Sequence, residues 1–108
     1  VIMSRHSGAR MLDSTASLVG LDFETEATSE TVQLEPGSEL WIYSDAAIEL
    51  TDVAGDEMGT TGFRDAISLV RNTGQSQSAT QAMRQLLASF SGRDQFIDDL
   101  SLMVVRWN

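Results

Sequence analysis

Acidic side chains follow one apolar run of the sequence and precede another. Asp45 comes directly after the run at residues 40–43, and Asp98 and Asp99 come directly before the run at residues 100–107. In antiparallel neighbours the end of one strand lies beside the start of the next, so Asp45 and Asp98 are expected to converge at one sheet edge. Converging carboxylates stay ionised only with a cation between them. Because Mg²⁺ and Mn²⁺ prefer oxygen ligands, the pattern indicates a metal site.

The same acids have a second interpretation that needs no ligand. Asp is common in turns, where its side chain accepts hydrogen bonds from nearby backbone amides. An acidic pair in front of a strand is, in most proteins, a solvated loop. A separation of Asp45 from Asp98 beyond about 8 Å would exclude joint ligation and favour this interpretation. The spacing alone leaves both interpretations open.

The first half of the chain has the patterns of short strands. Residues 1–3 and 10–12 are predicted to form a hairpin around a turn. Polar and apolar residues alternate at 31–34, which is typical of a half-buried strand. The following Pro-Gly pair predicts a tight turn with positive φ at Gly37. The run at 40–43 is expected to pair with 31–34 in antiparallel fashion.

Two amphipathic helices are predicted in the second half. A single short turn is expected at 46–50, and Thr60 or Thr61 is then expected to cap the first helix. Ser78 opens a capping box for the second helix, and Gly92 ends it. The apolar positions recur at spacings of three and four. The first face carries Phe63, Ala66, Ile67 and Val70, and the second carries Ala79, Met83, Leu86, Leu87 and Phe90.

The order of elements predicts an α+β fold, with two helices on one face of a mostly antiparallel sheet. The closing run at 100–107 is apolar at nearly every position and is therefore expected to be a central strand covered on both faces. Trp41 and Trp107 are expected to pack on neighbouring strands, although an exposed Trp107 could instead anchor a partner. Arg64, Arg71 and Arg84 could contact a phosphoprotein, but solvated helix faces are expected for them.

Length and composition narrow the functional classes. The 108 residues make one domain or part of one, and a chain that starts at Val1 is expected to be a fragment. The net charge of −9 argues against nucleic-acid binding and is compatible with divalent cations. The chain has no cysteine, which excludes thiolate metal sites. No apolar stretch is long enough for a membrane span and the first residues do not resemble a signal peptide, so a cytoplasmic protein is predicted.

Three motifs resemble those of one enzyme family. "LEPGSELWIYSDAAIE" (34–49) resembles "L-x-P-G-D-x-L-x-x-Y-S/T-D-G-x-x-E", "AGDEMG" (54–59) resembles a "GE-x-x-G" loop, and "DDLSLMVVRW" (98–107) resembles "DD-I/L-T/S-L-x-V-V". In this order they are similar to the metal-dependent serine/threonine protein phosphatases of PPM type (type 2C-like). The similarity is to the bacterial branch that controls sigma-factor and sporulation regulators. The chain resembles the C-terminal half of that domain.

The resemblance implies an α-β-β-α sandwich with two Mn²⁺ or Mg²⁺ ions at one end. Asp45 and Asp98 correspond to metal-binding aspartates. Asp99, Glu49 and Ala46 then lie around the ligands without binding the ions. The ions activate a bridging water that attacks phosphoserine or phosphothreonine, so no protein nucleophile is required.

The implied activity is dephosphorylation of a regulatory phosphoprotein, such as an anti-sigma-factor antagonist, by the effector domain of a response regulator or sensor. The implied partners are that phosphoprotein and a sigma-factor pathway protein, and a homodimer is left open. The early family motif "D-x-x-G-H-G" is absent, so these residues alone are expected to be inactive. Ala46 stands where the family has Gly. This difference points to an alternative, a catalytically degenerate adaptor that binds a sigma factor or its regulator.

Overall fold

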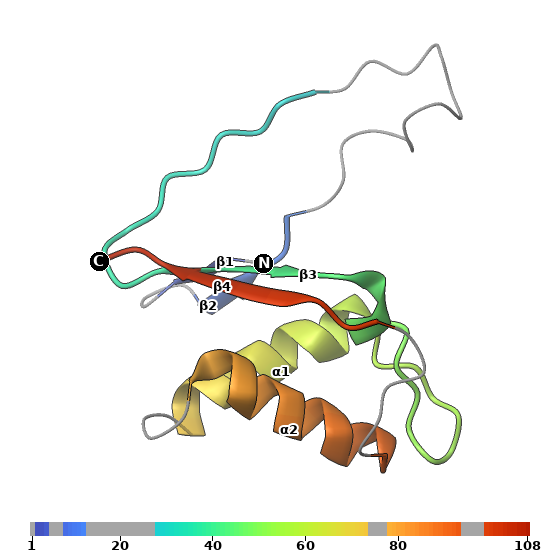
Figure 1. The fold of residues 1–108 in the computed structure, drawn as a ribbon. Coiled ribbons are helices and arrows are strands. Elements are labelled where there is room, and N and C mark those ends of the chain that lie inside the picture. The colour runs from blue at the N-terminus through green and yellow to red at the C-terminus, as the bar shows by residue number, and fades with distance from the viewer. Residues whose placement is uncertain (1, 5–7, 13–27, 74–77, 94–98) are drawn as a thin grey trace.

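Two helices pack on one face of a four-stranded antiparallel sheet, in the order β2-β1-β3-β4 (Figure 1). This computed structural model describes residues 2–4, 8–12, 28–73, 78–93 and 99–108. The predicted α+β class is confirmed. The elements are β1 (Ile2–Ser4), β2 (Gly8–Arg10), β3 (Glu39–Tyr43), the 3₁₀ turn η1 (Asp45–Ala47), α1 (Gly59–Thr73), α2 (Ala79–Ser91) and β4 (Leu102–Arg106).

Strand β3 lies between β1 and β4 and is antiparallel to both. Its ladder with β4 runs from the pair Glu39↔Arg106 to the pair Tyr43↔Leu102. The predicted N-terminal hairpin is present as β1 and β2, and the return strand begins at Gly8, two residues earlier than expected.

The prediction of a strand at residues 31–34 is wrong. Burial alternates there, but these residues form no ladder, because β1 and β4 take both edges of β3. The segment at 28–37 runs on the side of the sheet away from the helices (Figure 1). The predicted turn is present. The Ser38 N–H donates to the Glu35 carbonyl over 2.9 Å, and Gly37 has a φ of 88°.

The core lies between the sheet and the helices, as the apolar stripes predict. Trp41 of β3 is 1% exposed and belongs to one buried cluster with residues of both helices. The Tyr43 ring lies 4.4 Å from that of Phe63, which ties the end of β3 to α1. The buried helix residues are Phe63, Ala66, Ile67 and Val70 of α1 and Met83 and Leu87 of α2.

The observed ends of the helices agree in part with those predicted from the sequence. The Ser78 hydroxyl accepts the N–H of Gln81 at the start of α2, and Gly92 ends the helix with a φ of 68°. The expected cap of α1 at Thr60 or Thr61 is wrong, because the helix begins at Gly59 and both threonines lie in its first turn. No helix among the described residues is long and apolar enough to cross a membrane.

Strand β4 forms an edge of the described sheet, so the expectation of a central strand covered on both faces is wrong here. Burial alternates along β4, and Met103 is 58% exposed. Ile42 lies directly opposite Met103 and is 51% exposed. With Val105 and Trp107, these side chains form what we call the open apolar face, on the side away from the helices. Trp107 is therefore not packed as predicted, whereas Trp41 is.

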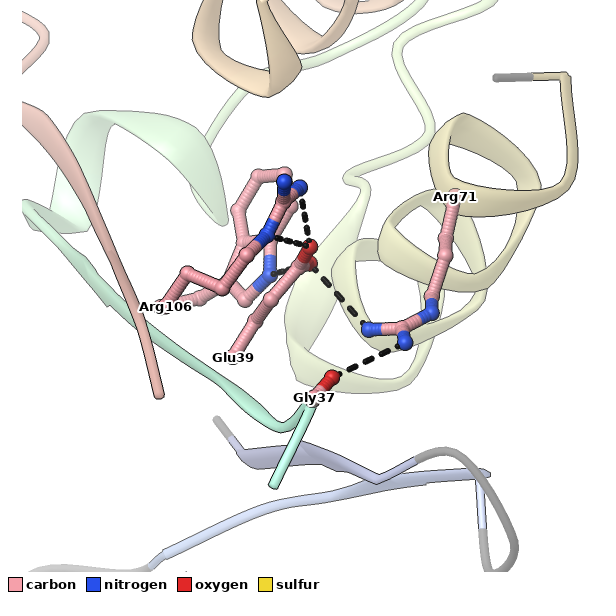
Figure 2. A network of polar contacts seen from close by, with 5 residues as sticks. Gly37, Glu39, Arg71 and Arg106 are labelled. Carbon is pink, nitrogen blue, oxygen red and sulfur yellow. Dashed lines mark hydrogen bonds and ion pairs between the residues drawn. The ribbon is translucent and has the colours of Figure 1, made fainter. Parts of the chain in front are cut away.

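A buried carboxylate ties the other end of the β3–β4 ladder to α1 (Figure 2). The Glu39 side chain is 5% exposed, and its Oε1 accepts from Arg106 Nη2 over 2.8 Å. Its Oε2 lies 3.5 Å from Arg71 Nη1 and accepts from Trp41 Nε1 over 3.2 Å. Arg71 also donates to the Gly37 carbonyl over 3.0 Å. Arg71 is therefore a structural residue and not the solvated helix residue predicted from sequence.

Replacement of Glu39 tests this network. Glu39→Ala is expected to lower the free energy of unfolding by about 3 kcal/mol, because the half-buried Arg71 loses its counter-charge. Arg106→Ala is the matched control. Its side chain is 63% exposed, so the expected loss is about 1 kcal/mol or less. Urea denaturation followed by circular dichroism measures both, and equal small losses would contradict a structural role for the buried carboxylate.

Candidate metal centre

The chain turns sharply at the end of β3, and Asp45 begins that turn. The Ser44 carbonyl accepts the N–H of Ala47 over 3.1 Å, and the Asp45 carbonyl accepts those of Ile48 and Glu49 over 3.0 and 2.9 Å. Ala47 is 1% exposed and anchors η1 in the core. The Asp45 and Glu49 side chains are exposed. The local sequence thus presents Asp45 at one end of the sheet, on a turn fixed by packing.

The segment that leads into β4 lies against this turn. The Ser44 N–H donates to the Ser101 carbonyl over 3.0 Å, and the Ser101 N–H donates to the Ser44 hydroxyl over 2.9 Å. The same hydroxyl donates to the Asp99 carbonyl over 3.2 Å. Asp45 and Asp99 are therefore at the same end of the sheet. Asp98 lies outside the described residues, so its convergence with Asp45 stays a prediction.

The loop at 54–59, which is the second motif, also lies against the turn that follows β3. The Met58 N–H donates to the Leu50 carbonyl and the Gly59 N–H donates to the Ile48 carbonyl, each over 2.8 Å. Gly55 and Gly59 have φ values of 88° and 67°, a region that side chains strongly disfavour. The two glycines of this motif are therefore explained by backbone geometry. They let the chain return to η1 before α1 begins.

Asp52 has the structural role that the sequence analysis gave as the second interpretation of aspartates, which is to shape a turn. Its Oδ1 accepts the N–H of Ala54 over 2.9 Å and that of Asp56 over 3.0 Å. This is the side-chain bonding that shapes an Asx turn. Asp52 therefore builds the loop. Asp45 differs, because its carboxylate has no such partner among the described residues.

The charges around η1 suit a cation, but the described residues supply only part of a ligand set. The ion pairs of the described residues use Glu30, Glu39 and Asp65 as acids, and none uses Asp45 or Glu49. Carboxylate oxygens are the donors that Mn²⁺ and Mg²⁺ prefer. No group of three His, Cys, Asp or Glu side chains that could hold a metal ion occurs within the described part of the chain. The donor type fits these ions, but the described residues alone do not make a complete ligand set.

Ala46 fits its position without strain. It lies inside η1, and the φ angles of a 3₁₀ turn are negative. A Cβ atom is therefore tolerated where the phosphatase motif has Gly, and its side chain is half-buried beside the buried Ala47. The substitution supplies no structural argument that the site is degenerate.

Sequence reasoning did not single out Ser44, which makes the direct side-chain contacts between the two acid-bearing segments. Its partner Ser101 is 57 positions away, so no local spacing predicts the bond. The available signal was a hydroxyl residue between a strand and an Asp-containing turn, in the "YSD" of the first motif.

An α+β fold with acids gathered at one end of an antiparallel sheet is the class of structure that the phosphatase motifs predict. The sequence profile of the Stage II sporulation protein E family (SpoIIE) matches residues 1–108. The chain belongs to this family, which is a family of type 2C phosphatases. No curated protein and no solved structure is significantly similar to it.

Proposed function

We propose that this chain is part of a metal-dependent protein serine/threonine phosphatase domain. The observation that carries the proposal is the meeting of three family motifs around η1, which places Asp45, the 54–59 loop and the segment after Asp98 at one end of the sheet. Membership of the SpoIIE family supports the activity in its general form.

Asp45 and Asp98 would hold Mn²⁺ or Mg²⁺ in this proposal. When bound, the ions supply a water of lowered pKa and neutralise charge on the phosphoryl group. The chain's own residues fix the geometry. The β3–β4 ladder sets the spacing of the two segments, and the buried Ala47 holds η1 in place. Glu49 and Asp99 are exposed at the same end of the sheet, and their negative charge attracts cations to it.

The proposed substrate is a phosphorylated regulatory protein of bacterial signalling, such as an anti-sigma-factor antagonist. Family membership supports this choice, since the family is named for a sporulation protein. We place the domain in the cytoplasm, as the effector of a response regulator or sensor protein.

We further propose that a preceding segment of the same protein completes the domain with a second sheet. The support is the open apolar face, in which Ile42, Met103, Val105 and Trp107 are each 45% to 58% exposed. Contiguous exposed apolar side chains commonly mark a surface that another element covers. A second sheet on this face would complete the sandwich, and its segment would also carry the ligands that the described residues lack.

The activity is tested by Asp45→Asn in the complete domain. Mn²⁺-dependent release of phosphate from a phosphoseryl protein is expected to fall by at least about 100-fold, because a carboxylate ligand is lost. Asp65→Asn is the matched control, since Asp65 is an exposed acid on α1 that pairs with its neighbour Arg64. Near-wild-type release by Asp45→Asn would contradict the assignment. A folded wild-type domain with no release and no heat of Mn²⁺ binding would favour the adaptor.

The second sheet is tested by charging the open apolar face. Met103→Lys in the complete domain is expected to lower the free energy of unfolding by more than about 2 kcal/mol, because the ammonium would be buried without a partner. Leu69→Lys is the matched control, since Leu69 on α1 is 55% exposed and Met103 is 58% exposed. Equal tolerance of both substitutions in urea denaturation would show that nothing covers this face.

A further inference from the structure

We infer that the Ser44 hydroxyl is a positioning group that sets the spacing between Asp45 and the segment that leads into β4. The inference rests on the proposed function and adds a residue that the three motifs do not assign to the metal centre. Ser44 is adjacent to Asp45, and its side chain bonds to the backbone on either side of Leu100.

The backbone of Ser44 explains why a hydroxyl is needed at this position. In a regular antiparallel ladder, a hydrogen-bonded pair exchanges two N–H to carbonyl bonds. Ser44 and Ser101 make one of these, from the Ser44 N–H to the Ser101 carbonyl. The Ser44 carbonyl does not make the other bond and instead accepts the N–H of Ala47, which begins η1. The hydroxyl accepts the Ser101 N–H in its place.

The Ser44 hydroxyl also donates a hydrogen bond, and it does so to the same segment before β4. Its proton is donated to the Asp99 carbonyl over 3.2 Å, and it makes no capping bond to η1. One side chain therefore holds two backbone groups of the β4 approach, two residues apart. A serine before a helical turn ordinarily caps that turn. Here the hydroxyl joins the Asp45 turn to the Asp99 segment.

Loss of the hydroxyl would affect the stability of the fold and the metal centre to different extents. Asp99 and Ser101 are exposed, so water can replace the lost bonds and the loss of stability is expected to be small. Ligand geometry is less tolerant, because a binding site requires its groups within about 0.5 Å of the productive arrangement. A small loss of stability with a large loss of metal affinity would be the signature of a positioning residue.

The test is Mn²⁺ binding by calorimetry to the complete domain carrying Ser44→Ala, Ser44→Thr or Ser101→Ala. Ser44→Ala is expected to weaken Mn²⁺ binding by about 10- to 100-fold, as the loss of groups that orient ligands does elsewhere. Ser44→Thr keeps the hydroxyl and is expected to restore affinity. Ser101→Ala is the matched control, because only the backbone of Ser101 takes part in the bonds described above. Hydrogen exchange of the Ser101 amide should accelerate in Ser44→Ala and not in Ser44→Thr.

Each outcome decides the inference. Wild-type affinity in Ser44→Ala, with Mn²⁺ bound normally by the unsubstituted domain, would overturn the role of Ser44 and leave the proposed function standing. Absence of Mn²⁺ binding in the unsubstituted domain would overturn the proposed function and the inference with it. If Ser44→Ala does not fold, Ser44→Cys replaces it. Its thiol is a weak hydrogen-bonding group, so reduced affinity is expected and unchanged affinity would contradict the inference.

Discussion

The antiparallel pairing of β3 with β4 is the interaction on which both the core and the candidate metal centre depend. Contacts at both ends fix its register: Glu39 pairs with Arg106 at one end, and Ser44 bonds to Ser101 at the other. A slip of one residue would move every side chain of a strand to the opposite face of the sheet. Trp41 would leave the core, and Asp45 would lose its place beside the Asp99 segment. The polar contacts at the two ends therefore support the same register as the buried side chains.

Patterns confined to neighbouring residues predicted much of this fold. The spacing of Phe63 and Ile67 identified the buried face of α1, and the start and end of α2 followed from Ser78 and Gly92. Predictions that required a distant partner were less successful. Residues 31–34 alternate as a strand would, but the edges of β3 are occupied by segments remote in sequence. Apolar content placed β4 at the centre of a sheet, whereas it forms an edge of the described one.

In the candidate site, too, features set by neighbouring residues could be predicted and features that need a distant partner could not. The position of Asp45 at the end of a strand could be predicted, because it depends on a local run of β-forming residues. The roles of Ser44 and Arg71 could not, since each acts on groups at least 32 positions away. Asp52 and Asp45 look alike in sequence, and only the hydrogen bonds of the loop show that Asp52 shapes the turn. The sequence therefore offered several acids as candidates, and the structure shows that Asp52 is used to shape the loop.

The measurement that tests the account most directly is the position of the metal. Crystals of the complete domain grown with Mn²⁺ would be examined by anomalous scattering at the manganese edge. The account predicts a peak at the η1 end of the sheet, with an Asp45 carboxylate oxygen about 2.0–2.6 Å from the ion. A manganese peak elsewhere in the domain, or no peak beside Asp45 at saturating Mn²⁺, would contradict the assignment of this end of the sheet as the metal centre.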